Sequence, residues 1–105
     1  MIPDFTRYVA VEYTADQTEA EIIPSPGGGK TIVIWDIVVS TGAAGTVLFE
    51  VNGDTRLFGR LSLAANGGWS FNSTNGVRVG ANKSLTLTST TGAGPLSVHI
   101  SYTLE

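Results

Sequence analysis

The feature that most constrains the fold of this chain is alternation of apolar and polar residues within short segments. Between Leu96 and Leu104 every second residue is apolar, and the residues between them are Ser97, His99, Ser101 and Thr103. A period of two is the pattern of a strand with one buried face and one exposed face. Turn signals recur about every ten residues, and no segment keeps a helical period. We therefore predict an all-β, antiparallel β-sandwich of about eight strands.

The turn signals divide the chain into the segments that we expect to be strands. They are 5–13, 18–23, 30–40, 45–52, 55–63, 69–72, 77–79, 84–90 and 96–104. The best hairpin signal is Asn52-Gly53, since both residues of such a turn must accept positive φ. In the return strand 55–63, alternation places Leu57, Leu61 and Leu63 inward and Phe58 outward.

The length of 105 residues fits one hydrophobic core, so we expect a single domain over 1–105. Residues 1–29 form a possible N-terminal arm or an edge segment. Within them, 18–23 has a helical turn as its alternative, because Thr18 and Glu21 fit a capping box. Pro24 and Pro26 would stop that helix at once.

Composition excludes several kinds of function. The net charge is −3 and the six basic residues are scattered, so we expect no nucleic-acid partner. The chain has no cysteine, which excludes disulfides and thiol chemistry. The first residues lack the pattern of a secretory signal, and the apolar run 32–39 is too short to span a membrane. We therefore expect a protein that is not secreted and has no membrane partner.

The stretch Gly29-Lys30-Thr31 resembles the end of a phosphate-binding loop. Such a loop needs a further glycine five positions earlier, where this chain has Pro24, and it must lead into a helix. Here it leads into a β-branched segment that predicts a strand. We expect a turn between two strands and no nucleotide cofactor.

No set of residues has the spacing of a catalytic or metal site. His99 is the only histidine, with no second ligand at a suitable spacing, and it lies on the polar face of its predicted strand. A Gly-x-Ser-x-Gly motif is absent. We predict no enzyme activity, no cofactor and no metal. A small hydrolase that uses His99 is a weaker alternative to a non-enzymatic role.

Two groups of side chains are candidates for binding. In 32–39 both strand faces are apolar, with Ile32, Ile34 and Val38 on one and Val33, Trp35, Ile37 and Val39 on the other. A sandwich strand buries one face, so the second needs a cover from the N-terminal segment or another subunit. An outward aromatic between two arginines is also typical of contact surfaces. The interface candidates are Trp35, Arg56, Phe58 and Arg60, although both arginines have plain solvation as their alternative.

Trp69 and Phe71 are candidate ligand-binding residues. They follow Gly67-Gly68, and aromatic residues beside glycines in loops are used by sugar-binding surfaces. Core packing is the alternative for Trp69, as it is for Trp35.

Over 30–104 the chain resembles the small single jelly-roll proteins of tailed-phage virions. The shared elements are Gly-Lys before a long apolar strand, a Gly-x-Val-x-Phe strand, Leu-x-Leu-Ala-Ala-Asn-Gly-Gly, Asn-Lys-Ser-Leu-x-Leu-Thr and a closing Val-x-Ile-x-Tyr strand. This is a pattern of strands and turns, without catalytic residues to carry over. The resemblance implies a jelly-roll-like sandwich.

The resemblance also implies a role. It points to a non-enzymatic structural protein of the virion, above all a homotrimeric capsid decoration protein on the major capsid protein. Such a protein is made in the host cytoplasm and ends on the capsid surface. The alternative is a receptor- or carbohydrate-binding module of a tail or head fibre, with a host-surface glycan as partner.

Overall fold

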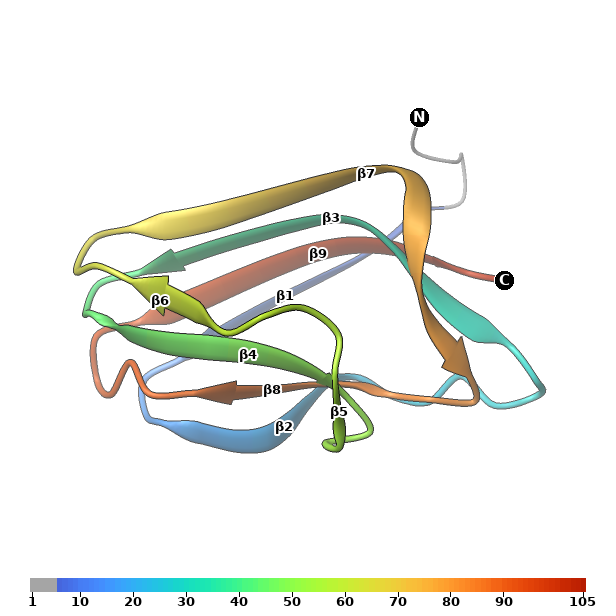
Figure 1. Cartoon of the computed structure of the whole chain (residues 1–105), viewed down its shortest axis with the longest axis horizontal. Helices are drawn as coiled ribbons and strands as arrows, with labels where there is room; N and C mark the ends of the chain where they lie inside the picture. The colour runs from blue at the N-terminus through green and yellow to red at the C-terminus, as the bar shows by residue number, and fades with distance from the viewer. Residues whose placement is uncertain (1–5) are drawn as a thin grey trace.

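The chain passes back and forth between two antiparallel sheets. In the computed structural model, which describes residues 6–105, sheet A has the strand order β1-β9-β3-β7 and sheet B the order β2-β8-β4-β5, with β6 also paired to β4. The strands of sheet A are β1 (Arg7–Tyr13), β3 (Thr31–Thr41), β7 (Gly68–Ala81) and β9 (Leu96–Leu104). Those of sheet B are β2 (Gln17–Ile23), β4 (Gly45–Val51), β5 (Thr55–Arg56), β6 (Leu61–Leu63) and β8 (Leu85–Ser89). Figure 1 shows β7, β3 and β9 of sheet A across the upper part of the view and β4, β8 and β2 of sheet B across the lower part.

The strand order is that of a jelly roll. No two neighbours in sheet A are consecutive in the sequence, because nearly every connection crosses to the other sheet. The short strands β5 and β6 both pair with β4 and share one position, so each sheet has four positions. Interleaving of this kind is two Greek keys closed into a double sheet. The predicted all-β, antiparallel, jelly-roll-like sandwich is therefore confirmed.

The core lies between the sheets and is built from the inward positions of alternating strands. In β9, Leu96, Val98 and Ile100 are buried, while His99 between them is exposed. The largest side chains with no more than 1% exposure are Phe49, Ile32, Ile34, Ile37, Leu85, Leu87, Leu96 and Ile100. Each such side chain stabilises the fold by about 1.5–3 kcal/mol through the apolar surface it removes from water. The alternation read from the sequence therefore identifies the buried face of β9.

Trp35 interrupts the alternation of β3. The register of β3 shifts between Ile34 and Asp36 against both neighbouring strands, so Trp35 is the extra residue of a β-bulge. The bulge changes the phase of the side chains that follow it. As a result the inward positions of β3 are Ile32, Ile34, Ile37 and Val39.

The expected division of β3 into two apolar faces is therefore wrong. A strict period of two placed Ile37 and Val39 opposite Ile32, and the bulge brings all of them to the core side. The outward apolar residues are Val33, Trp35 and Val38. Val33 is 1% exposed and Val38 is 52% exposed, so only part of the outward face lacks a cover within the chain.

Two segments also differ from the expected strands. The pieces 69–72 and 77–79 belong to one strand, β7, which continues through Gly76 at a φ of +78°. Figure 1 shows β7 turning sharply toward sheet B along its course. The expected strand 55–63 is instead divided into β5 and β6, and after the hydrogen bond from Leu57 N–H to Phe49 C=O residues 58–60 leave the ladder. Neither the continuity of β7 nor the division of 55–63 follows from periodicity, because both depend on contacts with other strands.

The N-terminal segment supplies an edge strand to each sheet. Within residues 6–105, β1 pairs only with β9, and β2 pairs only with β8. The helical alternative for 18–23 is wrong, since these residues lie in β2. Residues 1–5, including Phe5 of the first expected strand and the start of the possible arm, lie outside the described residues.

The glycine cluster before β3 is a turn, as predicted. Gly27, Gly28 and Gly29 all have positive φ, and Lys30 N–H donates to Gly27 C=O at 3.0 Å. Gly29 N–H donates to the side-chain oxygen of Asn82 at 2.8 Å, in the loop that follows β7. The cluster thus leads into a strand, and Gly29 N–H is already bound within the protein.

Candidate interaction surface

The outer face of sheet A is the most distinctive surface of the described chain. Cross-strand register sets its side chains in rows: Glu12–Ser97–Ser40, then Ala10–His99–Val38–Ser70, then Tyr8–Ser101–Asp36–Asn72. Most of these side chains are small or uncharged, which makes the face flat and weakly charged. We refer to these rows as the outer face.

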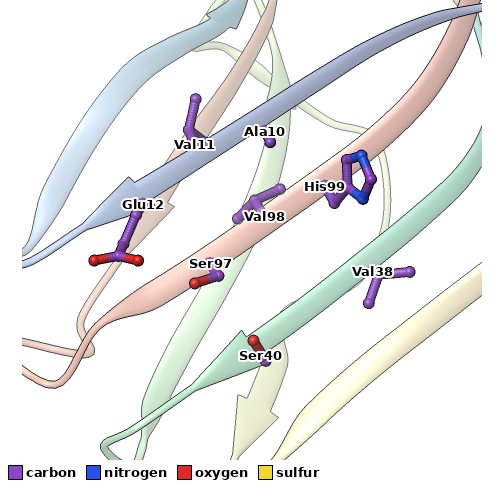
Figure 2. Close-up of a pocket in the computed structure, with 8 residues that line it drawn as sticks. All are labelled: Ala10, Val11, Glu12, Val38, Ser40, Ser97, Val98 and His99. Atoms are coloured by element: carbon purple, nitrogen blue, oxygen red, sulfur yellow. The ribbon is translucent and has the colours of Figure 1, made fainter.

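A shallow hollow of about 350 Å³ lies in the outer face, over β1, β9 and β3. Figure 2 shows Ala10, Val38, Ser97 and His99 around it, with Glu12 and His99 at well-separated places along it. The hollow exists because Ala10 and the serines are short beside larger neighbours. It is open to solvent, and its walls are strand positions rather than loops.

Two large hydrophobic residues are exposed on this face. Tyr8 is 65% exposed and Val38 is 52% exposed, and no other large hydrophobic residue of the described chain is this open. The Tyr8 ring lies against His99, with ring centroids 6.3 Å apart. Exposed apolar side chains on a flat, weakly charged strand face are the composition of a contact surface.

His99 shares the hollow with serines and a carboxylate, but they do not form a catalytic group. The residues directly opposite His99 are Ala10 and Val38, so Glu12 and Ser40 lie only on its diagonals, at a spacing of about 7–8 Å. In residues 6–105 no hydrogen bond joins His99 to either side chain, and no three metal-ligating side chains gather. The geometry provides a base without an aligned nucleophile or acid.

The four predicted interface residues do not form one surface. Trp35 lies on the outer side of sheet A, half-buried, and its indole N–H donates to Thr103 Oγ1 at 3.0 Å. Arg56 and Arg60 are exposed, and they lie in and just after β5 of sheet B. Of the four, only Trp35 belongs to the same sheet as Tyr8 and Val38.

Phe58 is a correction to the sequence analysis. It was expected to point outward between the two arginines, and it packs inward against the core. Its ring centroid lies 5.1 Å from that of Phe71, 5.8 Å from that of Trp69 and 6.3 Å from that of Phe49. The reason is that residues 58–60 leave the β-ladder, so alternation no longer sets the direction of their side chains.

Trp69 and Phe71 belong to this aromatic cluster. Both lie on the core side of β7, opposite Val39 and Ile37, and both are half-buried. Their rings stack at 5.9 Å with an interplanar angle of 9°, and Phe58 meets the edge of Trp69. Each ring is therefore in contact with other aromatic side chains of the cluster.

Sequence reasoning missed Tyr8, Ala10 and Val38 as surface residues. For Tyr8 and Ala10 a signal was present, because alternation with Val9 and Val11 places them outward. For Val38 there was none, since its direction depends on the bulge at Trp35.

Comparisons with known proteins concern the fold. No family model matches the chain, and no curated protein matches it in sequence. A solved structure of Bacillus endospore appendages, described as a novel family of disulfide-linked pili, is similar with a TM-score of 0.54 and 20% identity over 95% of this chain and 88% of that chain. The crystal structure of PirA aligns at a TM-score of 0.36 and 13% identity over 98% of this chain and 97% of that chain, a score too low to indicate a shared fold. In residues 6–105 no helix is long and apolar enough to cross a membrane.

Proposed function

We propose that this chain is a non-enzymatic structural protein that assembles with other copies of itself on the surface of a larger particle. The observation that carries the proposal is the outer face of sheet A, where Tyr8 and Val38 are exposed and most of the other side chains are small or uncharged. Such a face loses little by desolvation when a second protein covers it, since few charges have to be stripped of water.

Two further points support a structural role. The resemblance of 30–104 to single jelly-roll virion proteins supports a capsid decoration protein of a tailed phage, trimeric and bound to the major capsid protein. The likeness to the chain of the endospore appendages favours a domain that builds larger assemblies. Assembly by disulfides, which the description of those pili names, is not open to this chain because it has no cysteine.

Sedimentation velocity tests the self-assembly. We expect the protein at micromolar concentration to sediment well above its monomer mass of 11.0 kDa, and Val38→Lys to shift it toward monomer. The matched control is Ser62→Lys, an exposed position on β6 of the other sheet. A wild-type protein that stays monomeric, or equal loss of assembly in both variants, would contradict the proposal.

The genes beside this one test the finer assignment. A neighbouring major capsid protein gene supports capsid decoration, and neighbouring tail genes support the fibre module instead. Neighbouring genes of a pilus or appendage would contradict the virion assignment and keep the structural role.

A further inference from the structure

We propose that β1 is an assembly edge, at which β1 of one copy pairs antiparallel with β1 of a second copy about a two-fold axis at Ala10. The two copies of sheet A then form one continuous sheet across the contact. This inference rests on the proposed self-assembly and adds a contact at the edge of sheet A, beside the outer face.

The four sheet edges of the described chain differ in how well they could accept another strand. β2 has two irregularities in its pairing with β8 and a positive φ of 51° at Glu19. β7 has two register shifts against β3 and positive φ at Gly76 and Gly80. β5 and β6 are two and three residues long, separated by residues outside the ladder. Bulges, short strands and interruptions are the usual devices that prevent edge pairing.

β1 has none of these devices. Seven consecutive residues, Arg7 to Tyr13, pair with β9 without a register shift. The strand contains no proline, its two charged residues, Arg7 and Glu12, lie toward its ends, and its backbone has no positive φ. An edge strand leaves the N–H and C=O of every second residue directed away from its sheet, so among residues 6–105 β1 presents a regular row of groups without a strand partner.

The sequence of β1 is complementary to itself. Antiparallel pairing centred on Ala10 sets Val9 opposite Val11 of the second copy and Tyr8 opposite Glu12, with Ala10 facing Ala10. Cross-strand valine pairs stabilise a sheet, and like charges do not meet in this register. Pairing over the whole strand forms about six to eight backbone hydrogen bonds.

The exposure of the side chains of β1 fits the same register. Val9 and Val11 are half-buried on the core side, and a second β1 would cover what remains open of them. On the outer face, the hollow is bounded at the β1 edge by Ala10 and Glu12. The second copy places its 65% exposed Tyr8 beside that Glu12, where the phenol O–H can donate to the carboxylate. A two-fold contact at β1 and the three-fold arrangement implied by the resemblance use different axes, so one does not preclude the other.

A charge-pairing experiment tests the two-fold axis. Ala10 is exposed in the single chain, so Ala10→Lys and Ala10→Glu should fold normally. In the proposed contact each puts two like charges opposite one another, and we expect at least a tenfold weaker self-association for each variant alone. An equimolar mixture should regain the wild-type sedimentation, because residue 10 then faces the opposite charge. Failure of the mixture to regain it would overturn the inference.

A single cysteine gives a second readout that does not depend on affinity. Directly opposed residues in antiparallel strands have Cβ atoms about 4.5–5.5 Å apart, within reach of a disulfide after small adjustment. Because the chain has no other cysteine, Ala10→Cys should form a covalent dimer on oxidation, and the control Ser62→Cys, exposed on β6 of the other sheet, should not. Equal yields from both variants would overturn the inference.

The outcomes also separate this inference from the proposed function. If the wild-type protein assembles and both Ala10 charge variants assemble equally well, self-assembly stands and the β1 edge is not its site. If the wild-type protein is monomeric at every concentration and Ala10→Cys forms no dimer, both fail.

Discussion

At the residue scale, Gly76 shows how one position allows a long edge strand to lie over the outward side chains of β3. Its φ is +78°, and a Cβ placed there would overlap Val33 Cγ1 and lie 3.4 Å from the Trp35 ring. Val33 points to the outer side of sheet A and is 1% exposed, so the backbone at Gly76 and the indole of Trp35 form its cover. The glycine is thus required by a close approach as well as by its backbone conformation.

Gly76→Ala should lower the free energy of unfolding by about 2–4 kcal/mol, because the methyl group adds steric overlap to backbone strain. Gly92→Ala is the matched control: its φ is +59° and nothing lies within 4 Å of the added Cβ. It should cost only about 1 kcal/mol from strain. Urea denaturation of both variants measures the difference, and equal losses would show that the contact with Val33 is unimportant.

Tyr13 should make stability depend on alkaline pH. Burial against the core raises the pKa of its phenol above 10.0, so the folded state favours the neutral form. The stabilisation is complete below pH 10 and is lost as the pH rises through the raised pKa of the folded state. We expect the free energy of unfolding to fall less steeply above pH 10 in Tyr13→Phe than in the wild type. Denaturation curves between pH 9 and pH 11 test this, and identical slopes would contradict it.

At the scale of elements, the strands of sheet B are joined by a side chain as well as by the backbone ladder. The Thr88 hydroxyl on β8 accepts a hydrogen bond from Glu19 N–H of β2 at 3.1 Å and donates to Glu50 Oε1 of β4 at 2.7 Å. It therefore replaces a ladder bond where β2 is irregular, since the register shifts between Gln17 and Ala20. Glu50 is only 8% exposed, and Thr88 is a hydrogen-bond donor to its carboxylate.

Thr88→Val should destabilise the protein by about 1–3 kcal/mol, because it leaves the Glu19 N–H and the Glu50 carboxylate without this partner. Thr88→Ser keeps the hydroxyl and should recover most of the loss. Thr74→Val, at an exposed position of β7, is the control and should change stability by less than about 0.5 kcal/mol. Thermal denaturation gives the ranking; a Thr88→Ser variant as unstable as Thr88→Val would point to packing instead.

The sequence predicted strands best where alternation is uninterrupted. β9 was found with its buried face because its period of two is regular, and β1 and β4 were found as strands with nearly their observed bounds. β3 was found, but its residues after Trp35 were assigned to the wrong faces, because the bulge there shifts the alternation of side chains. The break in 55–63 and the continuity of β7 were missed, since turn residues such as Asn75-Gly76 can also occur inside a bent strand.

At the scale of the whole molecule, an aromatic cluster closes one side of the sandwich. Phe71 and Trp69 belong to β7, the edge of sheet A, and Phe58 lies between the short edge strands of sheet B. Phe49 of β4 connects the cluster to the core, with ring centroids 6.3 Å from Phe58 and 6.5 Å from Trp69. Side chains thus join these two edges where no backbone hydrogen bonds can.

Trp69→Ala should therefore unfold the protein more easily, with a loss of about 2–4 kcal/mol. Phe58→Ala should show coupling of about 0.5–1.5 kcal/mol with it in a double-mutant cycle, since the two rings meet edge to face. Guanidinium denaturation of the single and double variants measures this. A stable Trp69→Ala variant that loses binding to a glycan array would instead support the fibre-module alternative.

The sequence alone determined the class of the fold and most of its buried residues, because alternation, turn residues and the hydrophobic effect act locally along the chain. It also contained the regular, self-complementary edge strand β1. Only the tertiary structure decided which outward residues meet, because the phase shift at Trp35, the departure of Phe58 from its ladder and the exposure of Val38 depend on contacts between strands distant in sequence. The candidate surface is made of such contacts, and a linear pattern does not encode them.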